Sequence, residues 1–212
     1  MKIPSQFGFY SVLTNPLKGY DYITRLLVDY RIAFVQLRIK DGSYDEILRT
    51  ASMMREITAN SSTKLIINDY PEIALEIGAD GAHVGQEDTA IEEVRSKLGE
   101  ECIIGLSTHS LSQCIDACSR KPDYIGVGPV YPTPTKKNPD PVLGISIMKE
   151  MLLNATVPAV SIGGIDLSNI REVLDAGAKN FCMVRQFTQS DNPEQVLKDI
   201  IKIYNEYYSD FY

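Results

Sequence analysis

Long apolar runs are missing from this chain of 212 residues. No segment approaches the roughly 18 consecutive apolar residues of a membrane-spanning helix. The first residues, MKIPSQFGFYSVL, also lack the long apolar segment and the small-residue cleavage site of a secretion signal. We therefore expect a cytoplasmic protein with no membrane partner.

Positive charge and cysteine are both in short supply. The 21 Lys and Arg residues against 28 Asp and Glu give a net charge of −7, which argues against non-specific binding to nucleic acid. A few local cations can still set the field of a cleft for an anionic small molecule. The four cysteines form no Cys-x-x-Cys pair, so free thiols in a reducing compartment are favoured over a metal site or a disulfide.

Apolar strand patterns and amphipathic helix patterns alternate along the chain. The predicted strands cover residues 7–13, 32–37, 65–67, 82–84, 102–106, 123–127, 157–162 and 180–184. A helical pattern follows each of them. Eight strands, each followed by a helix, predict an α/β fold, a single (β/α)₈ TIM barrel over residues 1–212. A doubly wound open sheet is the alternative; the strand count and the lack of a second domain or long linker favour the barrel.

Polar residues gather where the predicted strands end. In a parallel barrel these positions share one rim, which is where barrel enzymes place their chemistry. The cations, hydroxyls and glycine amides found there suit an anionic phosphate. In chain order, these candidates are Gln36, Arg38, Lys40, Asn68, Asp69, Gln86, Glu87, Asp88, Ser107, Thr108, His109, Thr133, Thr135, Lys136, Lys137, Gly163, Gly164 and Arg185.

Two acids on this rim point to a metal. Asp69 follows the third predicted strand and Asp88 the fourth, so the two side chains can face each other across a pocket. Mg²⁺ takes oxygen ligands and keeps waters for a substrate phosphate, so the pair predicts a magnesium site that bridges to phosphate oxygens. The alternative is that both acids are ordinary turn residues, and this stretch alone leaves both interpretations open.

The other candidates have structural alternatives too. Arg38 and Lys40 can be solvated surface charges. His83 is expected to pack in or beside the fourth strand, and His109 can cap a helix. The Gly163-Gly164 pair can be a turn, although glycines after the seventh strand of a barrel often hold phosphate through backbone amides. The placement of all these residues at strand ends favours a binding site.

Six segments carry a more specific signal: QLRIK at 36–40, IIND at 66–69, GADGAHVGQED at 78–88, GLSTHS at 105–110, DYIGVGPVYPTPTK at 123–136 and SIGGI at 161–165. In this order, and over nearly the whole chain, they resemble the signature set of the thiamine phosphate synthase family. The resemblance implies a (β/α)₈ barrel and a transferase of thiamine biosynthesis. Such an enzyme joins hydroxymethylpyrimidine diphosphate to hydroxyethylthiazole phosphate, or to its carboxylated form, and releases pyrophosphate.

The resemblance also implies roles for the matched residues. The 36–40 segment would hold the pyrimidine diphosphate, Asp69 and Asp88 would ligate Mg²⁺, and the stretch 133–135 would help to hold the thiazole phosphate. In the family the pyrophosphate leaves first and the thiazole nitrogen captures a pyrimidinylmethyl cation, so catalysis rests on positioning and charge stabilisation. The implied catalytic residues are Arg38, Lys40, Ser107 and Lys136. The implied substrate-binding residues are Gln36, Leu37, Arg38, Ile39, Lys40, Asn68, Ser107, Thr133, Pro134, Thr135, Lys136, Gly164, Val184 and Arg185.

Two positions depart from the family pattern and keep rival functions open. Ile39 stands where the family usually has Glu, and by strand alternation its side chain should point away from the pyrophosphate. Arg185 stands where the family usually has Ser.

The rivals are a thiazole tautomerase-like relative and a catalytically silent paralogue that binds a thiamine-pathway phosphate. An epimerase-type barrel is disfavoured, because it needs metal-binding histidines and the chain has only two. The oligomeric state stays open, a homo-oligomer included.

Overall fold

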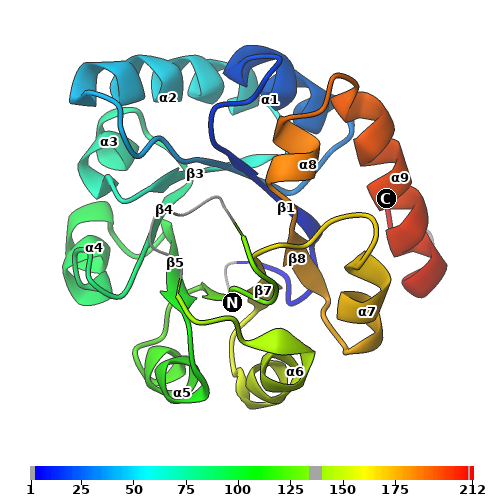
Figure 1. Ribbon diagram of the computed structural model, residues 1–212. Helices are drawn as coiled ribbons and strands as arrows, with labels where there is room; N and C mark the ends of the chain where they lie inside the picture. Colours follow the sequence, from blue (N-terminus) through cyan, green and yellow to red (C-terminus); the bar gives the residue numbers. More distant parts are fainter. Residues whose placement is uncertain (1–2, 134–139, 210) are drawn as a thin grey trace.

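A computed structural model describes residues 3–133, 140–209 and 211–212. Its strands form one closed barrel in which each strand pairs in parallel with the next and β8 pairs with β1 (Figure 1). The predicted (β/α)₈ barrel is confirmed. The strands are β1 (Gly8–Leu13), β2 (Phe34–Leu37), β3 (Lys64–Asn68), β4 (Gly81–Val84), β5 (Ile103–Thr108), β6 (Tyr124–Val127), β7 (Ala159–Ser161) and β8 (Asn180–Cys182).

Helices surround the barrel as an outer ring (Figure 1). They are α1 (Tyr20–Asp29), α2 (Tyr44–Thr58), α3 (Pro71–Glu76), α4 (Ile91–Leu98), α5 (Leu111–Ser119), α6 (Gly144–Asn154), α7 (Ile170–Asp175), α8 (Arg185–Thr188) and α9 (Pro193–Tyr207). The short α8 is an extra helix between β8 and α9 that the sequence pattern did not predict. Along the described part of the chain, no helix combines the length and apolar character needed to cross a membrane.

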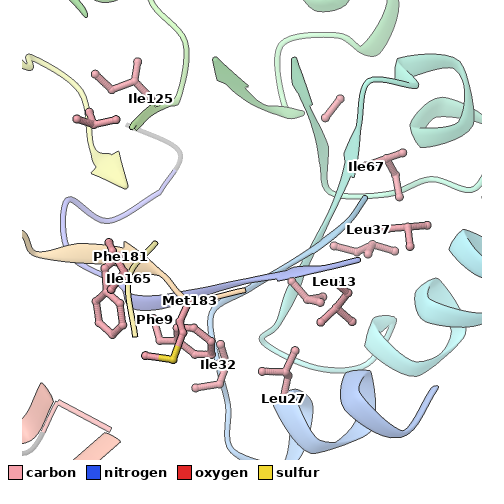
Figure 2. Packing of buried hydrophobic residues seen from close by; sticks show 14 of the residues in the cluster. Phe9, Leu13, Leu27, Ile32, Leu37, Ile67, Ile125, Ile165, Phe181 and Met183 are labelled. Atoms are coloured by element: carbon pink, nitrogen blue, oxygen red, sulfur yellow. The ribbon is translucent and has the colours of Figure 1, made fainter. Parts of the chain in front are cut away.

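Strand alternation divides the apolar residues into two clusters. Side chains that point outward, such as Phe9, Leu13 and Phe181, pack against the helices in the larger cluster (Figure 2). Side chains that point inward, such as Phe7 and Phe34, fill the barrel interior, where these two rings lie edge to face with centroids 4.7 Å apart. The inward cluster is the smaller one, and the polar residues described below lie above it.

One strand extends further than expected. The sequence pattern ends the fifth strand at residue 106, but β5 continues through Thr108. Ser107 pairs with Gly126 and Thr108 with Val127 of β6, and the Thr108 hydroxyl donates to the carbonyl oxygen of Gly126 at 2.8 Å. This pairing with a distant segment keeps polar residues in the strand. All four cysteines are free, as expected.

Candidate active site

A cavity of about 900 Å³ opens among the carboxyl ends of the strands. Most of the predicted site residues line it. They are Gln36, Arg38, Lys40, Asn68, Asp69, Asp88, Ser107, Thr133, Gly164, Val184 and Arg185. Pro134, Thr135 and Lys136 lie outside the described residues.

The end of β2 and the segment that follows it alternate between cavity and core. Gln36, Arg38 and Lys40 line the cavity. The side chains of Leu37 and Ile39 are buried in the outer apolar cluster, so only their backbones are left for ligand contact. The Ile39 side chain thus points away from the cavity, as strand alternation indicates. Gln36 is nearly buried, whereas Lys40 lies at the exposed end, so this side of the cavity becomes more charged from floor to rim.

The acids and cations at the rim form one charged cluster. Lys40 forms an ion pair with Asp69. Burial raises the pKa of Asp69, Lys40 lowers it, and the neighbouring charge of Asp88 raises it again. Burial lowers the pKa of Arg38, while the charge of Asp69 opposes that shift. The predicted meeting of Asp69 and Asp88 is therefore present, with two cations beside them.

The backbone of Asp69 and the side chain of Asp88 are both held in place by their surroundings. Asp69 has a φ of 64°, a left-handed conformation that is uncommon for residues with a side chain. Its backbone N–H donates to the carbonyl oxygen of His83 at 2.9 Å, which holds this turn in place. Asp88 accepts a hydrogen bond from the backbone N–H of Gly85 at 2.7 Å. Unusual backbone geometry of this kind concentrates at functional sites.

The floor of the cavity is a chain of hydrogen bonds between neighbouring strands. Gln36 donates to the Tyr10 hydroxyl at 3.0 Å, and the Tyr10 and Tyr124 hydroxyls lie 2.7 Å apart. Nδ1 of His83 lies 3.0 Å from the Tyr124 hydroxyl and Nε2 lies 2.9 Å from the Ser107 hydroxyl. Burial raises the pKa of both tyrosines, so they stay neutral. Neutral groups can satisfy the whole chain, for example with Tyr124 donating to His83 and His83 to Ser107.

Tyr10, His83 and Tyr124 were not predicted as site residues. His83 packs in β4, as expected, but its side chain points into the cavity and not into the outer core. Strand alternation carries the missed signal: the neighbours of His83 in the strand, Ala82 and Val84, both lie in the outer cluster, so His83 must face inward. The same rule places Tyr10 between outward-facing neighbours on β1.

The opposite wall is built from two loops in close contact. Gly163 and Gly164 follow β7 with φ values of 98° and 66°. A Cβ added to Gly164 would meet the carbonyl oxygen of Pro132 at 2.6 Å, and one added to Gly163 would meet Cα of Pro129 at 2.6 Å. Glycine is therefore required at both positions by conformation and by the packing of the loop after β6. Thr133 from that loop and Arg185 from α8 line the cavity on this side.

Comparison with known proteins places the chain in a family. The family model described as thiamine monophosphate synthase matches residues 18–187. The chain belongs to the thiamine monophosphate synthase family. The resemblance seen in the sequence motifs is confirmed, and with it the expected enzyme class, a transferase.

Individual relatives agree with this family. A thiamine-phosphate synthase of Dictyoglomus thermophilum is 40% identical over 185 residues, which cover 87% of this chain and 83% of that protein. One of Caldicellulosiruptor bescii is 36% identical over 181 residues, covering 85% and 83%. The solved thiamine phosphate pyrophosphorylase of Pyrococcus furiosus superposes with a TM-score of 0.85 at 26% identity, covering 95% of this chain and 96% of that one.

Proposed function

We propose that this protein condenses hydroxymethylpyrimidine diphosphate with hydroxyethylthiazole phosphate, or with its carboxylated form with additional loss of carbon dioxide, to give thiamine phosphate and pyrophosphate. The observation that carries the proposal is the charged cluster of Arg38, Lys40, Asp69 and Asp88 on one rim of the cavity. A diphosphate needs both cations and a metal-binding pair of acids, and this cluster offers both.

The donor substrate fits the wall that runs from Gln36 to Lys40. The floor offers aromatic faces and hydrogen-bonding groups, which suit a flat heterocycle. The rim offers Arg38 and Lys40, which suit a diphosphate. The pyrimidine ring then lies deep, near Gln36 and Tyr124, and its diphosphate lies at the rim. Asn68 and Ser107 line the cavity between these levels and supply further hydrogen bonds.

The two rim carboxylates, Asp69 and Asp88, suit a magnesium ion. Among the described residues, no group of three or more His, Cys, Asp and Glu side chains is arranged to hold a metal. Mg²⁺ commonly binds through one or two carboxylates together with waters and substrate phosphates, which matches Asp69 and Asp88. When bound there, the ion supplies charge neutralisation for the leaving diphosphate.

The reaction is a substitution at the methylene carbon of the pyrimidine. The bond between that carbon and the diphosphate oxygen breaks, and its electron pair leaves with pyrophosphate. Arg38 and Lys40 stabilise the charge that develops on the leaving group. The lone pair of the thiazole nitrogen then forms the new carbon–nitrogen bond. No protein nucleophile is needed, because the cavity has only to hold the acceptor nitrogen against the reacting carbon.

The acceptor's phosphate is proposed to bind on the wall made by the loops after β6, β7 and β8. Thr133, Gly164, Val184 and Arg185 line this wall. Barrels commonly bind phosphate at the loops after the seventh and eighth strands. Arg185 adds a forked cation that suits an anionic acceptor.

Product formation tests this proposal. The purified protein is incubated with the pyrimidine diphosphate and each form of the thiazole phosphate, with Mg²⁺ or after chelation. We expect thiamine phosphate and pyrophosphate in equal amounts, only with the metal present. Binding of a substrate without any product would favour the silent paralogue. Conversion of the carboxylated thiazole to its isomer, without condensation, would favour the tautomerase-like relative.

A further inference from the structure

His109 joins the two ends of the loop between β6 and α6. Its Nδ1 lies 2.6 Å from the carbonyl oxygen of Gly128, where the loop begins, and its Nε2 lies 3.5 Å from Oδ2 of Asp140, shortly before α6 begins. The backbone N–H of His109 donates to Oε1 of Gln113 at 2.7 Å, which anchors the histidine to α5. Only 17% of the side chain is exposed. Through its backbone and its ring, His109 therefore connects α5 to both ends of one loop.

The partners of the ring determine where its hydrogen lies. A carbonyl oxygen can only accept, so Nδ1 of His109 must carry the hydrogen that bonds to Gly128. Nε2 faces a carboxylate, which also only accepts, so a second proton on the ring would add an ion pair with Asp140. The histidine thus acts as a donor at the start of the loop in either protonation state.

The same loop builds the wall assigned to the acceptor. The backbone N–H of Val130 donates to the carbonyl oxygen of Ile162 and that of Tyr131 to Gly163, both at 2.9 Å. Thr133, two residues further on, lines the cavity. Any shift of the stem formed by residues 128–131 and 140–144 would move Thr133 and the Gly163-Gly164 turn together.

We infer that His109 is a positioning residue that fixes this stem and, through it, the acceptor side of the cavity. The functional half of the inference rests on the proposed function; the geometric half does not. Backbone hydrogen bonds also cross the stem, since the N–H of Leu143 donates to the carbonyl oxygen of Pro129 at 2.8 Å and that of Gly144 to Val130 at 3.1 Å. His109 adds a side-chain link that reaches both ends of the stem.

The position of the hydrogen can be observed directly in solution. The chain has only two histidines, so a protein labelled with ¹⁵N at histidine gives two imidazole patterns, and the pattern lost in His109→Asn belongs to His109. We expect a protonated Nδ1 in the free enzyme. A bare Nδ1 with the hydrogen on Nε2 alone would show that the bond to Gly128 does not exist, and would overturn the inference.

Two substitutions separate positioning from contact with substrate. His109→Asn keeps an amide donor close to the place of Nδ1, whereas His109→Phe keeps a ring and removes both donors. Amide hydrogen exchange at Leu143 and Gly144 reports on the stem and needs no substrate. We expect about tenfold faster exchange in His109→Phe, because one hydrogen bond between neutral groups contributes about that much. In His109→Asn we expect exchange close to wild type. Ser112→Ala, in the first turn of α5, serves as the control and should change neither readout.

Kinetics complete the test. In His109→Phe the KM for the thiazole phosphate should rise about tenfold with the loss of that bond, while the KM for the pyrimidine diphosphate stays close to wild type, and His109→Asn should restore most of the loss. An equal rise in the KM for the thiazole phosphate in both variants, with unchanged amide exchange, would mean that His109 contacts the acceptor itself. Unchanged exchange in His109→Phe would by itself also overturn the positioning role. If His109→Phe does not fold, the imidazole spectrum of the wild type still tests the bond to Gly128. The amide exchange and KM of His109→Asn then test whether a donor at that place is enough to hold the stem. If the wild type forms no product, the proposed function fails, and the exchange data still judge the stem.

Discussion

Strand β3 has a Lys–Asp ion pair at each end, and the two pairs differ in their surroundings. Lys64 pairs with Asp80 at the amino end, and Lys40 pairs with Asp69 at the carboxyl end. Their exposed fractions are almost the same, 48% and 15% against 47% and 15%, so exposure cannot tell the pairs apart. Asp80 also accepts from Arg55 at 3.2 Å and from the backbone of Leu65 at 3.0 Å. Asp69 instead faces another acid and an open cavity.

Two asparagines repeat this contrast. Asn180, at the amino end of β8, accepts from the backbone N–H groups of Phe7 and Gly8 and donates to the carbonyl oxygens of Ser5 and Ala159. Asn68, at the carboxyl end of β3, is also nearly buried, yet its amide makes no hydrogen bond to another described residue and lines the cavity. Polar groups that are fully paired inside the protein stabilise the fold, whereas polar groups left facing a cavity are available to a ligand.

The largest expected effect is at the acid pair. Asp69→Ala or Asp88→Ala should lower product formation by roughly a hundredfold to a thousandfold, the scale for removing one preorganised electrostatic group. Both variants should stay folded because neither side chain belongs to the apolar core. Asp80→Ala is the matched control: it should lower the free energy of unfolding and leave turnover per folded molecule intact. Steady-state kinetics and urea unfolding measure both quantities, and full turnover of either rim variant after chelator treatment would contradict the metal assignment.

Asn180→Ala should give the next largest effect, and on stability instead of activity. It leaves two buried N–H groups and two part-buried carbonyl groups without these partners. We expect a loss of about 3 kcal/mol in the free energy of unfolding, since one unsatisfied buried group costs about 1–3 kcal/mol. Urea unfolding measures it, with kinetics at low temperature as the control. A variant as stable as wild type would show that exposure to water replaces these bonds.

Asn68→Ala should show the opposite behaviour on a smaller scale. The KM for the pyrimidine diphosphate should rise about tenfold, the equivalent of one hydrogen bond to a charged or polar ligand group. The free energy of unfolding should stay close to wild type, because no protein partner loses a bond. Substrate titration and urea unfolding of the same preparation provide the comparison. A large loss of stability with unchanged substrate binding would erase the distinction between the two asparagines.

Arg185→Ser should give the smallest effect. Arg185 lines the cavity on the acceptor side, and a guanidinium can hold a phosphate through two parallel hydrogen bonds. We expect binding of the thiazole phosphate to weaken about fivefold to tenfold, the size of one such contact, with little change for the pyrimidine diphosphate. Calorimetric titration of both substrates measures this. Tighter binding by the Ser variant would mean that Arg185 obstructs the site, and the silent paralogue would then be the better interpretation.

The sequence alone predicted the barrel and most of the rim. Buried parallel strands leave runs of apolar residues, and the polar residues that follow each run mark the rim, so Arg38, Asn68, Asp69 and Asp88 were all found. The short α8 was missed because a helix of four residues has too few turns to show a period. The extension of β5 and the link between His83 and Tyr124 depend on pairing between distant strands, which no local pattern contains.

The central claim is that the rim cluster binds a diphosphate together with Mg²⁺. Calorimetric titration of inorganic pyrophosphate into the free protein tests it most directly, with and without Mg²⁺, and with Lys64→Ala as a control beside Lys40→Ala and Asp69→Ala. We expect binding that requires Mg²⁺, that both rim variants weaken at least tenfold, as expected for lost charge-assisted contacts, and that Lys64→Ala leaves unchanged. Equal affinity after chelation, or equal losses in Lys40→Ala and Lys64→Ala, would contradict it.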